Sequence, residues 1–88
     1  MTEEQFRTQL QDWGYGEPRI KEFEPNLDGD MHAHDFSVFG LVTRGRLTLA
    51  FEGSSATYAA GECCELAAGT VHREQTGADG ATFLLATK

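Results

Sequence analysis

Apolar residues near the N-terminus recur at the spacing of a helix. Phe6, Leu10 and Trp13 follow one another at intervals of four and three residues, so they share one face of a helix. The segment TEEQ at residues 2–5 is typical of a capping box, in which threonine and glutamine side chains bond the first free backbone N–H groups. We therefore expect one short helix within residues 1–14, whose aromatic face packs against the domain or against a partner subunit.

After this helix the pattern changes to short runs in which apolar and polar residues alternate. The runs are HAHDF (32–36), VFGLVT (38–43), RLTLAF (46–51), SATYA (55–59), ECCEL (62–66), TVHREQ (70–75) and ATFLLAT (81–87). The turn signals between them are EG at 52–53, AG at 60–61, AG at 68–69 and GADG at 77–80. Many short strands separated by turns are typical of an all-β sandwich or barrel, which we expect within residues 19–86.

The length of the chain bounds its organisation. At 88 residues it predicts a single domain, residues 1–88, with no linker or internal repeat. A domain of this size buries only about 60 to 65 % of the surface that its unfolded chain exposes. Because the core is modest, we expect the protein to gain stability as a homodimer.

The charge and the apolar runs exclude several kinds of partner. Fourteen acidic and seven basic side chains give a formal net charge of −7, and the basic residues are scattered along the chain. Such a surface repels phosphate backbones, so we expect no nucleic-acid partner. No apolar run approaches the about 18 residues of a membrane span. The N-terminus also lacks the basic and apolar regions of a secretion signal, so we expect no membrane association and a cytoplasmic location.

The two cysteines, Cys63 and Cys64, are adjacent. In a strand their side chains point to opposite faces, so they cannot easily bridge each other. Cys64 shares its face with Leu66, and Cys63 shares the other face with Glu65. We expect two small apolar residues of a strand, with Cys64 in the core if Leu66 is there; a thiol close to a metal is the alternative.

All three histidines of the chain fall within the strand-rich region. His32 and His34 are two positions apart, so an extended segment directs both imidazoles to one face, together with Phe36 and Val38. His72 comes forty residues after His32. A single histidine is most often a partly buried, hydrogen-bonded side chain. Two strands can nevertheless bring three imidazoles to one metal ion and leave coordination positions for water or substrate.

The spacing of these histidines and of nearby glycines resembles the two sequence motifs of the cupin family. The first motif is a glycine, five residues, HxH, three or four residues, a glutamate, six residues and a glycine. The chain matches its histidines with His32 and His34 and its last glycine with Gly45. Asn26 stands in place of the first glycine, and Val38 stands in place of the glutamate. The carboxylate ligand of the family is therefore missing at its usual position.

The second motif is a glycine, five residues, PxG, two residues, a histidine, three residues and an asparagine. The chain matches it with Gly61, Gly69 and His72, while Ala67 replaces the proline and Thr76 replaces the asparagine. The resemblance implies a cupin-type double-stranded β-helix, also called a jelly-roll barrel, preceded by the one short α-helix.

The resemblance also implies a metal site inside the barrel. The family's metal is bound by three histidines and one glutamate, so the implied ligands in this chain are His32, His34 and His72. The ion is a divalent transition metal, and because imidazole suits zinc, iron, nickel and copper alike, its identity stays open.

Three other carboxylates could fill the missing position. Asp35 lies on the face opposite His34, and Glu65 lies on the face of Cys63. Glu74 shares the face of His72 and is the best substitute. A charged residue near the mouth of a barrel is more simply explained as solvated, however, so we expect Glu74 to face water.

The resemblance leaves three functions open. One is a metal-dependent oxygenase or isomerase acting on a small molecule, similar to the three-histidine iron dioxygenases that act on thiols or diketones. The second is a non-catalytic module that binds a small ligand or senses a metal, and the third is a barrel that has lost its metal. No general base is evident beyond the three histidines. The apolar lining expected for the cavity is Phe36, Val38, Val42, Leu47, Leu49 and Phe51. We expect a metal-binding cupin whose partner is a small molecule.

Overall fold

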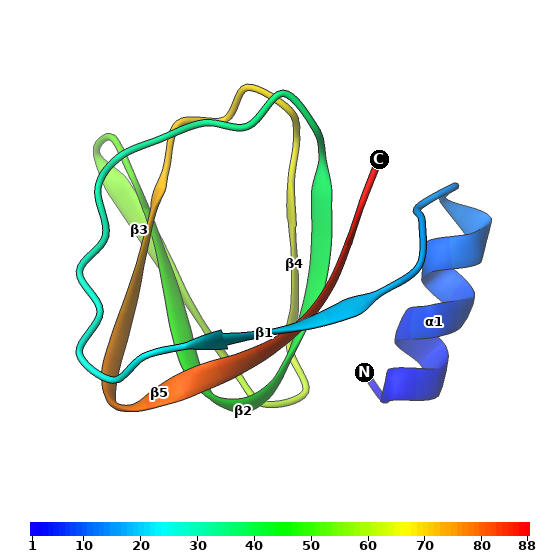
Figure 1. Cartoon of the computed structure of the whole chain (residues 1–88), viewed down its shortest axis with the longest axis horizontal. Coiled ribbons are helices and arrows are strands. Elements are labelled where there is room, and N and C mark those ends of the chain that lie inside the picture. The colour runs from blue at the N-terminus through cyan, green and yellow to red at the C-terminus, as the bar shows by residue number, and fades with distance from the viewer.

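The computed structural model describes all residues, 1–88, and contains one helix and five strands. The elements are α1 (Glu3–Asp12), β1 (Arg19–Phe23), β2 (Val38–Phe51), β3 (Ser54–Ala59), β4 (Cys63–Leu66) and β5 (Arg73–Thr87). All strands pair antiparallel, in the order β1-β5-β2-β3, and β4 pairs with the first residues of β2. The strands curl around a common interior, and α1 lies outside them (Figure 1). The predicted all-β fold with one N-terminal helix is confirmed.

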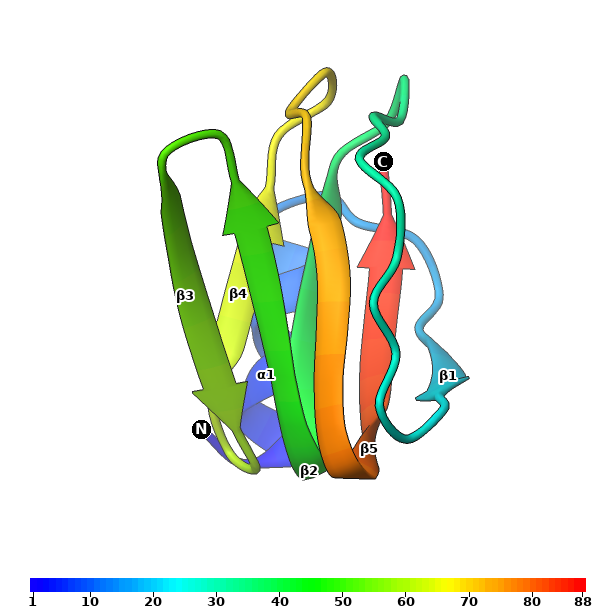
Figure 2. The same ribbon diagram turned by 90° about the vertical axis from the view of Figure 1, so that its left-hand side faces the viewer.

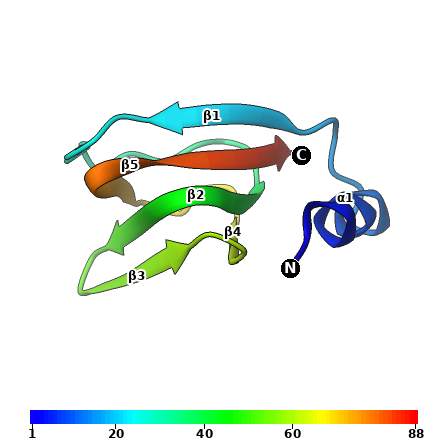
Figure 3. The ribbon, with the colours of Figure 1, turned by 90° about the horizontal axis from the view of Figure 1, so that it is seen from below.

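The two central strands are longer than the alternating runs predict. VFGLVT and RLTLAF form one strand, β2, and the expected turn at 77–80 lies inside β5. Irregular register between the two strands, from Val42 to Arg44 and from Gly45 to Leu47, allows them to bend without ending. The prediction of a turn at 77–80 was therefore wrong, because the glycines there mark a bend in a continuous strand. Both strands are strongly curved when seen from below (Figure 3).

The helix packs its apolar face on the outer side of the sheet. Thr2 caps α1 through the predicted capping box, and Phe6 and Leu10 are buried with 0 % and 3 % of their surface exposed. Trp13 remains 43 % exposed, but its ring lies 4.8 Å from the ring of Phe39 on β2. Of the two alternatives for the aromatic face, packing within the chain accounts for Phe6 and Leu10.

The interior of the barrel holds a second apolar core. Its buried members are Phe23, Val42, Leu47, Leu49, Cys64, Ala81, Phe83 and Leu85. Residues of β2 alternate between the two cores before the bend: Phe39 and Leu41 face the helix, and Val42 faces the interior. Because the bend shifts the alternation, Leu47 and Leu49 also face inward.

A long connection from β1 to β2, residues 24–37, runs beside the first half of β5 (Figure 2). Bridges join Asp28 to Gln75 and His32 to His72, and Gly29 donates its N–H to the Glu74 carbonyl at 3.0 Å. The run HAHDF was predicted as a strand, but only His32 pairs, and the chain bends at residues 35–36. This connection covers the edge of β5 and carries two of the three histidines.

No helix in the structure combines the length and the apolar character needed to cross a membrane.

Cys64 lies in the interior core, as the shared face with Leu66 predicts, and Cys63 packs against the helix-side core. Burial raises the pKa of the Cys64 thiol to about 12. In a Cys63→Ser variant at pH 8, the remaining thiol should therefore react with iodoacetamide about a thousandfold more slowly in the native protein than in the urea-unfolded chain, since only the thiolate reacts. Mass spectrometry of timed samples measures both rates; native and unfolded rates within tenfold of each other would contradict this burial.

Candidate metal centre

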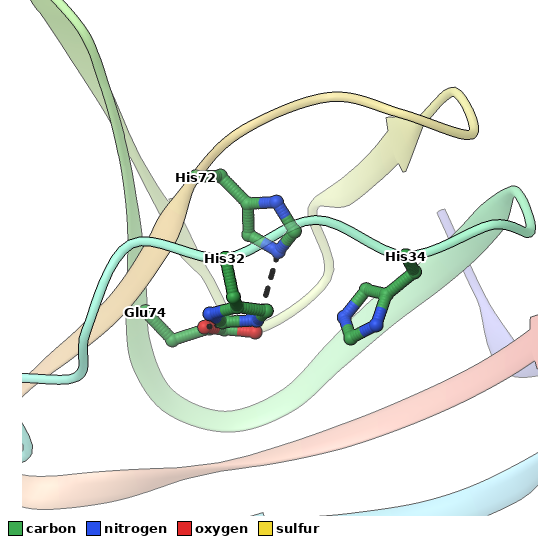
Figure 4. Close-up of side chains that lie close together, drawn as sticks. All are labelled: His32, His34, His72 and Glu74. Atoms are coloured by element: carbon green, nitrogen blue, oxygen red, sulfur yellow. Dashed lines mark ion pairs between the residues drawn. The ribbon is translucent and has the colours of Figure 1, made fainter.

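The backbone pairs the first and the last histidine directly. His32 and His72 exchange both backbone hydrogen bonds, at 2.8 and 2.9 Å, and their ring centroids lie 4.6 Å apart. The His34 carbonyl accepts a hydrogen bond at 2.8 Å from the N–H of Gly69, the second glycine of the second motif. The His34 ring centroid lies 4.9 Å from that of His32 and 5.5 Å from that of His72. The structure thus brings the three sequence-predicted histidines together (Figure 4).

A fourth residue, Glu74, completes the cluster. It lies on β5 two residues after His72, and its side chain is only 15 % exposed. One carboxylate oxygen lies 3.3 Å from Nε2 of His32, and the other lies 3.5 Å from Nε2 of His72 (Figure 4). The interpretation of Glu74 as a solvated residue was wrong, because the connection through Gly29 covers this part of β5.

The other two carboxylates considered as substitutes are elsewhere. Glu65 accepts a hydrogen bond at 2.7 Å from the hydroxyl of Tyr15, on the helix side of the sheet. Asp35 is exposed at the bend before β2. The group of residues able to hold a metal ion is His32, His34, His72 and Glu74, whose candidate ligand atoms all lie within 4.8 Å of one another.

Hydrogen bonds to the backbone fix which nitrogen of two rings faces this cluster. Nδ1 of His32 lies 2.7 Å from the carbonyl oxygen of Asp30, and Nδ1 of His72 lies 2.8 Å from that of Thr70. A carbonyl oxygen only accepts, so in each ring Nδ1 carries the hydrogen. In the neutral ring the electron pair is then on Nε2, which points to Glu74. Nε2 of His72 is buried and has no hydrogen-bond partner.

The cluster therefore consists of groups that offer electron pairs, and no hydrogen-bond donor lies between them. Two Nε2 atoms face the two oxygens of one carboxylate, at distances close to the about 3.4 Å that separate neighbouring ligands of a tetrahedral ion with bonds of about 2.1 Å. The backbone hydrogen bonds at Nδ1 are those that orient metal-binding histidines in proteins. These residues fit a divalent metal ion.

The third imidazole is also suited to remain neutral. Burial lowers the pKa of His34 below its ordinary value of 6.5, and the neighbouring His32 and His72 lower it further, against the opposite effect of Glu74. The ring stacks on Phe36, with centroids 4.8 Å apart. A lowered pKa leaves the nitrogen free to coordinate at neutral pH without loss of a proton.

A cavity of about 100 Å³ opens beside the cluster and extends into the barrel. Val38, at the position of the family's glutamate, lines it, as do Phe36, Leu47 and Leu49, so four residues of the predicted apolar lining are confirmed. The other two, Val42 and Phe51, belong to the surrounding core. His34, His72 and Glu74 belong to its polar lining, together with Arg19 and Lys21.

The comparisons with known proteins bear on the fold. No family model and no curated protein matches the chain. Among solved structures, a protein of unknown function from Rhizobium leguminosarum matches with a TM-score of 0.73 at 18 % identity, over 80 % of this chain and 66 % of that one. The EutQ protein of Clostridium difficile matches with a TM-score of 0.72 at 17 % identity, over 89 % of this chain and 60 % of that one. This chain thus spans less than two thirds of either protein.

A match of more equal length comes from a cupin-2 domain containing protein of Shewanella frigidimarina. Its TM-score is 0.66 at 19 % identity, and the match covers 92 % of this chain and 89 % of that one. An RmlC-like cupin and a double-stranded β-helix protein match similarly. The chain therefore has the fold of a small cupin, a double-stranded β-helix, and the fold expected from the two motifs is confirmed. The chain contains a cluster of three histidines and one glutamate that could bind a metal.

Proposed function

We propose that the protein binds one divalent transition metal ion through four residues, His32, His34, His72 and Glu74. The observation that carries this proposal is the pair of fixed tautomers, which turn the Nε2 electron pairs of His32 and His72 toward a carboxylate at 3.3 and 3.5 Å. A cation among these atoms accepts all of these electron pairs at once. The same site without a metal leaves Nε2 of His72 buried and unsatisfied, which is costly.

Glu74 supplies the carboxylate ligand that Val38, at the family's glutamate position, cannot supply. The family's carboxylate ligand comes from the strand that follows the HxH segment, whereas this one comes from β5, beside His72. The carboxylate offsets part of the charge of the ion and strengthens its binding relative to three neutral imidazoles. Nitrogen and oxygen ligands of this kind suit zinc, iron, nickel and copper.

The site would act on, or bind, a small molecule in the adjacent cavity. A bound transition metal supplies a Lewis acid there, and iron or copper also supplies redox chemistry. Of the titratable residues that line the cavity, His34, His72 and Glu74 belong to the proposed ligand set, and the pKa of Cys64 is raised to about 12. Arg19 and Lys21 also line the cavity, and arginine and lysine side chains offer N–H donors. With no base free to move a proton, oxygenation suits the site better than isomerisation does.

The absence of a free base among the lining residues also favours a second candidate, a non-catalytic module that binds a small ligand beside the metal. The two candidates differ in turnover. An oxygenase loaded with iron consumes dioxygen in the presence of its substrate, and small thiols and diketones are the first compounds to test. A binding module takes up its ligand at the same cavity without consuming dioxygen.

Metal analysis tests the proposal. Protein purified without an affinity tag and dialysed against zinc, iron, nickel or copper should retain close to one ion per chain of at least one of them. The His34→Ala variant should retain less than a tenth of an equivalent under the same conditions, because it loses a ligand and keeps the fold. Wild-type protein that takes up none of the four metals would overturn the proposal and leave a barrel that has lost its metal.

A further inference from the structure

The first strand of the barrel presents two cations to the cavity. Along β1, Arg19, Lys21 and Phe23 line the cavity. The alternate residues face outward: Ile20 is 69 % exposed, and Glu22 pairs with Arg44 on the outer surface. Because side chains at every second position share a face, Arg19 and Lys21 are adjacent on the inner face, about 7 Å apart along the strand.

These two cations have no anionic partner within the chain. Arg7, Arg44 and Arg73 each pair with a carboxylate. Arg19 and Lys21, like Arg46, take part in none of the ion pairs and in none of the side-chain hydrogen bonds, although acidic residues outnumber basic ones by fourteen to seven. The ammonium group of Lys21 lies over the Phe23 ring, 5.0 Å from its centre.

The single carboxylate that lines the cavity is already engaged. The two oxygens of Glu74 lie 3.3 Å from Nε2 of His32 and 3.5 Å from Nε2 of His72. The remaining lining is mainly apolar, with Leu47 and Leu49 among its members. A positive pair at the rim of an apolar cavity, in a chain of net charge −7, concentrates small anions locally.

Lys21 is also close to the proposed metal ligands. It lines the cavity together with His34 and borders a second surface pocket together with His32, His34 and Glu74. An anion held by Lys21 therefore lies beside the metal site.

We propose that the molecule bound in this cavity is a small carboxylic acid, whose carboxylate is held by Arg19 and Lys21 while the rest of the molecule occupies the apolar cavity toward the metal. This inference names the substrate class of the proposed metal site and rests on it. Arginine offers a planar pair of N–H donors that matches a carboxylate, and lysine adds a point charge. The volume of about 100 Å³ suits an acid with only a few carbon atoms, since a cavity of about 150 Å³ accommodates benzene.

Butanoate and its uncharged isostere butanamide are suitable probes. NMR titration of the zinc-loaded, full-length protein gives the Kd of each probe and the residues whose signals shift. We expect butanoate to bind at least tenfold more tightly than butanamide, with shifts at residues lining the cavity. Equal affinity for the two probes would overturn the inference.

Matched variants separate the two cations from the metal. Lys21→Met and Arg19→Met should each raise the Kd for butanoate about tenfold while leaving the zinc content at the wild-type level. Arg46→Met is the control, because it removes one charge from β2 outside this cavity and should change the Kd less than twofold. Binding that is lost on zinc removal but unchanged in Lys21→Met and Arg19→Met would place the carboxylate on the metal and overturn the inference. Repeating the titrations on zinc-free protein keeps this test independent of the metal-binding test.

Discussion

Glu74→Gln is expected to weaken zinc binding about a hundredfold. The variant keeps the size of the side chain but removes the one negative ligand of the proposed site, and neutral amides are poor partners for a transition metal. A hundredfold loss in affinity removes about 2.7 kcal/mol of the stabilisation that saturating zinc gives to the folded state. Calorimetric titration with zinc and urea unfolding with and without zinc measure both quantities.

The same variant separates a metal ligand from a structural carboxylate. In chelator-treated protein the glutamine amide can donate a hydrogen bond to Nε2 of His72, which has no partner. The stability of the metal-free variant should therefore equal or exceed that of metal-free wild type. Glu52→Gln, which makes the same change on an exposed turn, is the control and should bind zinc as wild type does. A zinc affinity for Glu74→Gln within threefold of wild type would leave three histidines as the only ligands.

Gly45→Ala is expected to lower the free energy of unfolding by about 3 kcal/mol. Gly45, the last glycine of the first motif, lies at the bend of β2 with a φ of +74°, a conformation that an L side chain adopts only at a cost. A Cβ there would also collide with the carbonyl oxygen of Gly80 on β5. Urea unfolding followed by circular dichroism measures the change.

A second glycine provides the matched control for this prediction. Gly53, in the turn between β2 and β3, has a φ of +83°, but a Cβ there would meet nothing within 4 Å. Gly53→Ala should therefore cost only the conformational part, about 1 kcal/mol. Equal losses of unfolding free energy in the two variants would contradict this account. They would show that the close approach of β2 and β5 does not explain the need for glycine at position 45.

The histidines could be predicted from the sequence because their spacing survives changes in local structure. His32 and His34 were expected on a strand, and they lie instead on a connection in which only His32 pairs. An extended backbone at the bridge, with the HxH spacing, still turns both rings toward His72. The motif glycines and His72 kept their register with the family although Ala67 and Thr76 depart from its pattern.

The position of Glu74 shows what the pattern of residues could not supply. Shared parity with His72 correctly put its side chain on the inner face, but parity does not say whether that face is covered at this point. The cover comes from residues 24–37, where Gly29 bonds the backbone of Glu74 and Leu27 donates its N–H to the Thr76 hydroxyl. These contacts join segments more than forty residues apart, so no local sequence pattern predicts them.

The lengths of β2 and β5 were not predicted, for a related reason. Gly45, Gly77 and Gly80 each signal a turn when only the neighbouring residues are considered. In the barrel the two strands pair with each other on both sides of the bend, from Val38 to Ala50, so the glycines curve a continuous ladder. The choice between a turn and a bend depends on the partner strand.

Crystals of the zinc-loaded protein, with anomalous diffraction measured at the zinc absorption edge, test the central claim most directly. We predict a single strong peak about 2.0 to 2.2 Å from Nε2 of His32 and His72, from a nitrogen of His34 and from a carboxylate oxygen of Glu74. The absence of a peak among these four residues, in crystals that show zinc elsewhere or none at all, would contradict the assignment of this cluster as a metal centre.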